Sequence, residues 1–339
     1  MSRVPFPFEN LPQLSQSKIF SHFTPIDIFD YSLCSSKAKK CATMATPKLG
    51  KFSIVFGYES CKIIVQFQMR SDEFQFISLD KRGIREPRFM SRATINGHEV
   101  YLQKIGKYLE IYWDDRFVGH KMLADYLSTI FKRKYDELSV ETVDGALVNL
   151  WLSDGVPPTL KKLDVRFLSD DIVKRMLNSY KVTDVLAISR IDRQWNCDYY
   201  PKSLRIDMVE TSDLNLVYKM SSPQITVESC LFTEQHLNVF LKLWKNNDLP
   251  NLQHFRLNQE EFGAEGEYSL SAIFDGFKYV EHSQMTRRRI VVDSRKPRTI
   301  ERRGGYEIER ADGTHASIFF EDFNFLFWAH ARHGLPGRS

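Results

Sequence analysis

Two histidines close to the C-terminal end are the first residues whose spacing could support chemistry. His330 and His333 are three residues apart, so a helix would bring both imidazoles to one side, within reach of a metal ion. Neither a cysteine nor a carboxylate pair accompanies them, and the zinc-protease pattern His-Glu-x-x-His does not occur. We therefore expect no metal site, and we interpret both histidines as part of a solvated tail.

Glycine, serine and paired acidic residues give no better indication of an enzyme. Gly304-Gly305 is not followed by the lysine and helix of a phosphate-binding loop, and neither G-x-G-x-x-G nor G-x-S-x-G occurs. Asp170-Asp171 and Glu260-Glu261 could be paired acids. We interpret the first pair as the start of a helix and the second as a solvated loop. The sequence therefore predicts no catalytic residue and no cofactor.

Arginine and tryptophan side chains are better candidates for binding. The basic stretch from Arg287 to Arg303 could hold an acidic partner or phosphates, but charge runs usually face water, so we interpret it as a strand and an exposed loop. Trp195 stands in a polar segment, whereas the other tryptophans have apolar neighbours and are expected in the core. We expect Trp195, with Arg193 and Tyr199, to contact a substrate.

Short helices are expected at the start of the chain. Leu11-Pro12 opens the first helix and Thr24-Pro25 the second, because proline suits a first helical turn and threonine caps one. Ile19 and Phe23 share one face of the first helix. A helical stretch this short needs a partner, which is either the rest of the chain or another protein.

Strands follow after Pro47, where the apolar period changes to two. The first three runs predict an antiparallel meander, and Asn96-Gly97 predicts a tight hairpin between later strands. The expected strands cover residues 52–56, 62–67, 74–79, 92–100 and 108–113, and a helix is expected over residues 120–133.

The middle of the chain shows a looser repeat. Short apolar runs recur roughly every twenty to thirty residues between residues 138 and 257, which is typical of strand–helix repeats. Helices are expected over residues 169–180 and 233–244 between these runs. Alternation of strands and helices predicts a parallel sheet. We favour a curved sheet like that of leucine-rich repeats, with a compact α/β layer as the alternative.

Composition limits the class of protein. The chain has 339 residues, enough for two domains, and a net charge of +4, which does not indicate nucleic-acid binding. Its five cysteines are scattered and form no C-x-x-C, so we expect reduced thiols. With no signal peptide and no long apolar run, we expect a cytoplasmic or nuclear protein without a membrane partner.

The N-terminal residues resemble the F-box pattern. The residues that carry the resemblance are Leu11, Pro12, Ile19, Phe20, Phe23, Asp27, Ile28, Leu33, Ser35 and Lys37. The resemblance implies a three-helix module over about residues 4–45 that binds the adaptor subunit of a cullin–RING ubiquitin ligase. It assigns the adaptor contact to Leu11, Pro12, Ile19, Phe23, Ile28 and Leu33. The alternative is a helical hairpin packed on its own domain.

A second resemblance covers the later part of the chain. Residues 225–262 look like the type-2 F-box-associated domain of the large nematode F-box family, with Asn238, Phe240 and Trp244 on one helix. Residues 306–318 are similar to the closing hairpin of that family, and Asp312-Gly313 would form its turn.

These observations predict a non-enzymatic substrate-recognition subunit of an SCF-type ubiquitin ligase. The fold class expected is α/β (α+β overall), with a helical F-box, an antiparallel β-meander and leucine-rich-repeat-like strand–helix repeats. The domains expected are residues 1–46, 47–135 and 136–328, followed by a flexible tail over residues 329–339. The partners would be the ligase adaptor and a protein substrate. An α/β hydrolase or transferase, or a plain interaction scaffold, remains the alternative.

Overall fold

The computed structural model divides the chain into two compact units, residues 1–181 and 182–339. The four-part division expected from the sequence stays a prediction. The residues that the structure describes are 8–57, 60–83, 90–141, 149, 151–152, 158–166, 168–190, 201–208, 221–228, 232–258, 269–285, 287–291, 299–321 and 324–331.

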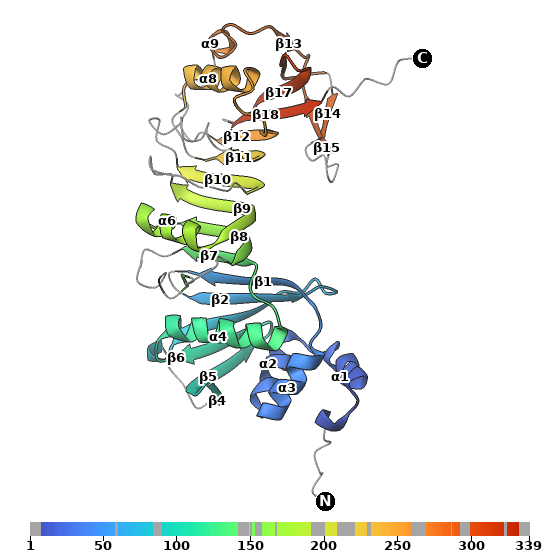
Figure 1. Cartoon of the computed structure of the whole chain (residues 1–339), viewed down its shortest axis with the longest axis vertical. Helices are drawn as coiled ribbons and strands as arrows, with labels where there is room; N and C mark the ends of the chain where they lie inside the picture. Colours follow the sequence, from blue (N-terminus) through green and yellow to red (C-terminus); the bar gives the residue numbers. More distant parts are fainter. Residues whose placement is uncertain are drawn as a thin grey trace, which may run out of the picture. The chain divides into compact units, whose positions relative to one another are not determined.

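The first unit is built on a mixed sheet (Figure 1). Its described strands lie in the order β8-β7-β1-β2-β3-β6-β5-β4. Strands β1, β2 and β3 form the predicted antiparallel meander, whereas β3–β6, β1–β7 and β7–β8 are parallel pairs. Their bounds are β1 (Leu49–Phe56), β2 (Cys61–Phe67), β3 (Phe74–Asp80), β4 (Ser91–Ile95), β5 (His98–Ile105), β6 (Tyr108–Trp113), β7 (Glu137–Glu141) and β8 (Thr159–Arg166).

Helix α4 (Arg116–Phe131) packs on one face of this sheet. Asp115 begins it, because its carboxylate accepts hydrogen bonds from the next free backbone amides. The ring of Phe131 lies 6.5 Å from that of Phe52 and 6.3 Å from that of Phe67. A second described helix, α6 (Asp170–Ser179), follows β8. The alternating burial of β2 and β3 follows from this one-sided cover.

Helices α1 (Gln13–Phe20), α2 (Pro25–Leu33) and α3 (Ser36–Ala45) form where short helices were expected, but they pack on the first unit. The ring of Phe29 lies 5.3 Å from that of Phe76 on β3 and 5.8 Å from that of Tyr126 on α4. The hydroxyls of Ser32 and Tyr126 are 3.0 Å apart. No separate N-terminal F-box helical domain is evident in the described residues. Helices this short bury their apolar sides against the sheet and α4 instead.

A capping box fixes helix α2 and ties it to the sheet. The Thr24 hydroxyl accepts from the amide of Asp27 at 3.1 Å, and the Asp27 carboxylate accepts from the amide of Thr24 at 3.0 Å. Lys104 on β5 donates to the same carboxylate at 2.7 Å. Burial raises the pKa of Asp27, but the hydrogen bonds from Lys104 and Thr24 outweigh it, so the pKa is lowered.

The second unit also has a mixed sheet. Its described strands lie in the order β13-β16-β17-β18-β12-β11-β10-β9. Strands β9 to β12 run parallel, whereas β12, β18, β17 and β16 pair antiparallel. The bounds are β9 (Lys181–Arg190), β10 (Ser203–Met208), β11 (Gln224–Val227), β12 (His254–Asn258), β13 (Tyr279–Glu281), β14 (Arg287–Val291), β15 (Thr299–Arg303), β16 (Tyr306–Glu309), β17 (Thr314–Glu321) and β18 (Asn324–Ala331). The helices are α8 (Glu234–Lys245) and α9 (Leu270–Ile273).

The predicted α/β fold with leucine-rich-repeat-like strand–helix repeats is wrong. Strands predominate over helices in the described residues, and both sheets are mixed. The parallel part of the second unit continues into antiparallel strands, with the predicted Asp312-Gly313 turn joining β16 to β17. A repeat would instead need each parallel strand to be followed by the same helical return.

Candidate functional site

The sheet of the second unit has an inner face that is closed by helix α8. The ring of Phe240 stacks on that of Phe255 at 4.5 Å and meets that of Phe327 edge-on at 5.2 Å. Trp244, one helical turn later, is fully buried and lies 5.3 Å from Phe327. Thr233 caps this helix, which forms where one was expected. Leu237, Phe240, Leu241 and Trp244 are all buried, and the expectation of a core position is confirmed for Trp244.

On the opposite side of the same sheet, strands β10 to β12 carry polar side chains. At or near the end of each of three successive strands, polar, apolar and polar residues follow in turn, namely 205–207 on β10, 226–228 at the end of β11 and 256–258 on β12. The apolar middle residue points to the inner face, so the residues beside it point outward. The register places Arg205 opposite Thr226 and Thr226 opposite Arg256. We call this surface the outer face.

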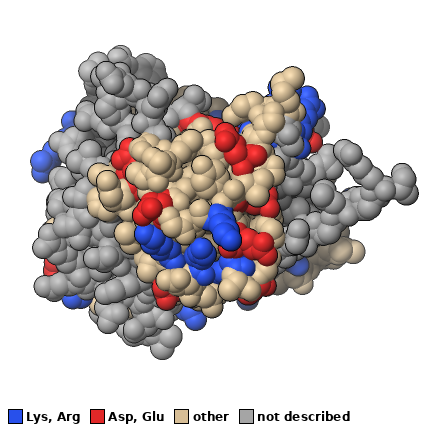
Figure 2. All heavy atoms as spheres, turned by 90° about the horizontal axis from the view of Figure 1, so that it is seen from above, with Lys and Arg blue, Asp and Glu red and all other residues tan. Residues whose placement is uncertain are grey.

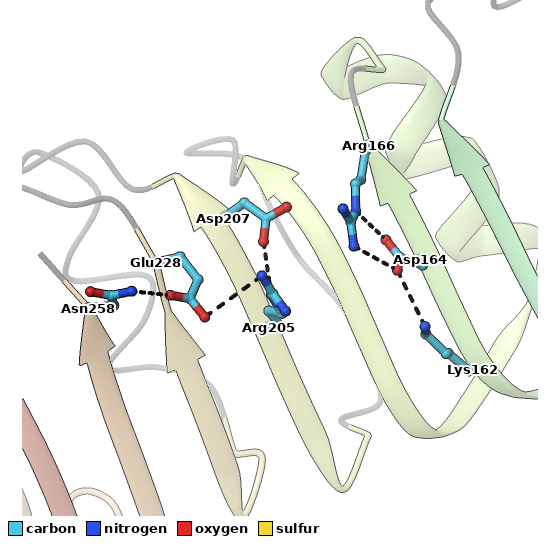
Figure 3. Close-up of polar contacts among 7 residues, drawn as sticks. All are labelled: Lys162, Asp164, Arg166, Arg205, Asp207, Glu228 and Asn258. Carbon is cyan, nitrogen blue, oxygen red and sulfur yellow. Dashed lines mark hydrogen bonds and ion pairs between the residues drawn. The ribbon is translucent and has the colours of Figure 1, made fainter. Parts of the chain in front are cut away.

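Hydrogen bonds and ion pairs join the outer face across the strands (Figure 3). Arg205 Nε is 3.0 Å from Asp207 Oδ1, and its Nη2 is 3.8 Å from Glu228 Oε1. Asn258 donates to Glu228 Oε2 at 2.9 Å, and Arg256 donates to Asn324 on β18 at 3.2 Å. Such partly exposed pairs contribute little to stability. They do hold the charged groups in fixed positions across neighbouring strands.

The charges of the outer face are set by arginine and carboxylate groups. His254, on the same side of β12, stacks on the ring of Trp328 at 5.2 Å. Burial and then the nearby Arg256 lower the pKa of His254 to about 4, so it is neutral at pH 7. Arg205 is 48% exposed and carries a permanent positive charge that a partner can reach.

Parallel strands normally have both faces buried, most often under helices. Of the helices described in the second unit, α8 lies on the inner face and α9 packs against α8. No described helix of this unit therefore covers the polar side chains of β10 to β12. A similar outward group occurs in the first unit, where Asp164 on β8 pairs with Lys162 at 3.4 Å and Arg166 at 2.9 Å (Figure 3).

The structure places the predicted adaptor-binding residues around helices α1 and α2. Pro12 is exposed, whereas Leu11, Ile19, Phe23 and Leu33 are half-buried. Ile28 is fully buried and can only support the surface from within. The predicted substrate-binding residues Arg193, Trp195 and Tyr199 lie outside the described residues.

Serine–histidine contacts do not form a catalytic arrangement in the described residues. Ser78 and His120 are 3.0 Å apart and fully buried, and burial lowers the pKa of His120 to about 3. His330 lies on β18, not in the predicted tail, with its Nε2 2.9 Å from the buried Ser317 hydroxyl. Among the described residues no group of three or more His, Cys, Asp or Glu could hold a metal ion. No described helix is long and apolar enough to cross a membrane.

The second unit thus combines a mixed sheet, one face covered by α8 and an ordered set of polar side chains on the other side. Residues 200–257 match the family model described as F-box associated. An uncharacterized protein of Caenorhabditis elegans is 25% identical over 358 residues, which cover 96% of this chain and 78% of that protein. No solved structure matches the chain. The matched segment is therefore F-box associated and similar to the nematode type, as the resemblance implied.

The outer face was missed by the sequence analysis, although a signal for it exists. The matched segment holds β10, β11, α8 and most of β12, and thus Arg205, Glu228 and Arg256. The repeated polar–apolar–polar ends of these strands mark the outward side chains. Only the parallel register shows that they form a continuous surface.

Proposed function

We propose that this protein is the substrate-recognition subunit of an SCF-type cullin–RING ubiquitin ligase, acting in the cytoplasm or nucleus. The match of residues 200–257 to the F-box associated family carries this proposal. In this role the chain itself catalyses no reaction. It holds a target protein close to the ubiquitin-loaded enzyme, so that proximity accelerates transfer to a target lysine.

The target would bind the outer face of the second unit. This surface lies largely within the family match and presents arginine, carboxylate and amide groups in fixed register. Ordered polar groups orient a partner at lower entropic cost than mobile ones. Residues 193–199 would add further contacts, as the sequence analysis expects.

The ligase adaptor would bind the first unit at the start of helix α1. Leu11 and Pro12 lie just before this helix, and Leu14 in its first turn is 83% exposed. Ile19, Phe23 and Leu33 lie on the same three-helix region, with Ile28 beneath them. An apolar side chain left this exposed near half-buried neighbours is a suitable contact for a partner.

Affinity purification of the full-length protein from nematode extract, followed by mass spectrometry, tests the proposal. We expect peptides of the adaptor and the cullin with the wild-type protein, and their loss with the Leu11→Ala/Pro12→Ala variant. Met69→Ala is the matched control, because Met69 is 93% exposed on the turn between β2 and β3. Circular dichroism would confirm that all forms are folded.

The possible results separate the parts of the proposal. Absence of adaptor and cullin peptides from the wild-type sample would refute the ligase function. Their undiminished recovery with the double variant would retain the ligase function and refute the contact at Leu11 and Pro12.

A further inference from the structure

Arginines face each other across the two-stranded sheet of β14 and β15, which we call the arginine ribbon. The register places Arg287 opposite Arg303 and Arg288 opposite Arg302. Like charges directly opposite in an antiparallel pair are destabilising. This arrangement therefore works against the stability of the ribbon on its own, and an anionic partner would relieve the repulsion.

Counter-charges from the described residues reach only part of the arginine ribbon. Arg302 Nε lies 3.3 Å from Glu321 Oε1 on β17. Arg287 and Arg303 are both exposed, and neither forms an ion pair with a described residue. Successive residues of a strand point to opposite sides, so the Arg287–Arg303 pair points away from the side that meets Glu321.

The arginine ribbon stands at the border of the outer face. Glu321, which pairs with Arg302, is directly opposite Asn324 on β18, and Asn324 accepts the hydrogen bond from Arg256 on β12. Gly305, just after the ribbon, lies so close to Phe319 on this side that an added Cβ would be 2.6 Å from the ring. The arginine ribbon and the outer face thus belong to one surface of the second unit.

Apolar side chains on the same side of the neighbouring strands β17 and β18 support this placement. Phe319, Leu326 and Trp328 form a cluster in which each residue is at most 6% exposed, although they point to the side opposite α8. Strand β14 contacts β18 on which two of them lie. A ribbon fixed on an apolar base can present its exposed arginines in a constant position.

We propose that the arginine ribbon binds an acidic segment of the target protein, rich in aspartate and glutamate, that continues onto the outer face. This inference rests on the proposed function. Arg256 on β12 and the ribbon arginines lie on separate strands of separate sheets, so the surface offers several cations and not a single compact site. Several spaced carboxylates match them, and each guanidinium can bind one carboxylate with two hydrogen bonds.

Basic residues also gather elsewhere, which calls for a control. Figure 2 shows Lys and Arg side chains grouped in the middle of the face seen from above, bordered by Asp and Glu. Lys242 and Lys245 on α8 are exposed basic residues outside the arginine ribbon. Substitution of both changes the net charge as much as substitution of two ribbon arginines.

Fluorescence anisotropy with the purified full-length protein tests the inference. The probe is a fluorescein-labelled peptide of alternating glutamate and serine, compared at low salt with a peptide of alternating lysine and serine. We expect binding of the acidic peptide, and about a tenfold or greater loss of affinity in Arg287→Gln/Arg303→Gln. Lys242→Gln/Lys245→Gln should bind within about twofold of the wild type, since local geometry and not net charge would determine affinity.

Several results would overturn the inference: no binding of the acidic peptide, an equal loss in both double variants, or binding only of a phosphoserine peptide or of single-stranded RNA. The measurement needs no ligase component. Peptide binding without recovery of the adaptor would therefore refute the proposed function alone, and adaptor recovery without peptide binding would refute the arginine ribbon alone.

Discussion

Trp244 shows how one side chain can determine the stability of the second unit. It is fully buried between α8 and β18, with its ring 5.3 Å from that of Phe327. We expect Trp244→Ala to lower the free energy of unfolding by about 3–5 kcal/mol, because a large cavity remains. Urea unfolding followed by circular dichroism measures this. Val239→Ala on the same helix is the control, since Val239 is 45% exposed and its loss should cost less than about 0.5 kcal/mol.

His120 gives the first unit a pH dependence whose sign can be derived. Burial lowers its pKa to about 3, whereas an unfolded histidine titrates near 6.5. Below that value the unfolded chain binds a proton that the folded chain does not, so stability falls as the pH decreases. From pH 7.5 to pH 5 this histidine should reduce the free energy of unfolding by about 2 kcal/mol.

The variant His120→Asn tests this contribution, since its amide can replace the contact of Nδ1 with Ser78. Urea unfolding at both pH values should show a smaller pH dependence for the variant than for the wild type. His98→Asn, on an exposed position of β5, should retain the wild-type dependence. If the pH dependence of the free energy of unfolding is unchanged in His120→Asn, a group other than His120 must cause it.

Turn chemistry was the most predictable feature at the scale of elements. Asn96 and Gly97 both have positive φ, at 49° and 88°, as a tight two-residue hairpin requires. Gly313 has a φ of 80° in the predicted turn between β16 and β17. These signals depend on a few adjacent residues, so the sequence alone was enough. Helix α8 was also predicted, over residues 233–244, and the structure places it over Glu234–Lys245.

Strand direction and the packing of short helices could not be predicted in this way. Whether β12 pairs with β11 alone or also with β18, which lies about seventy residues later, depends on long-range burial that no local pattern encodes. The sequence indicated the apolar sides of α1 to α3, but it did not indicate the surface against which they pack. Phe29 could have met another protein and instead meets Phe76 and Tyr126.

The chain just after the arginine ribbon depends on a glycine. Gly305 has a φ of 87°, and an added Cβ would be 2.6 Å from the Phe319 ring and 2.7 Å from a backbone oxygen. Gly313, with a φ of 80°, has nothing within 4 Å of that position. We expect Gly313→Ala to cost about 1–2 kcal/mol of backbone strain. Gly305→Ala should cost clearly more, because it adds a steric clash to the same strain. Equal losses in urea unfolding would contradict the close packing on Phe319.

At the scale of the whole molecule, the chain contains two compact units, each with its own core and its own polar surface. The proposed function assigns the adaptor to the first unit and the target to the second. Such a division allows one surface to change in sequence without disturbing the other. It also requires each unit to remain folded when the other is perturbed.

Hydrogen–deuterium exchange of the full-length protein can test this independence. Trp244→Ala should raise the exchange of amides in α8, β11, β12 and β18, because these elements share the core around Phe240 and Phe327. The amides of β1, β2 and β3 should keep their wild-type protection, since their core is formed with α4 around Phe52 and Phe131. A matching rise in β1 to β3 would show that the two units unfold together. In that case a substitution in the target-binding unit would also weaken the adaptor contact, and the two surfaces could not vary separately.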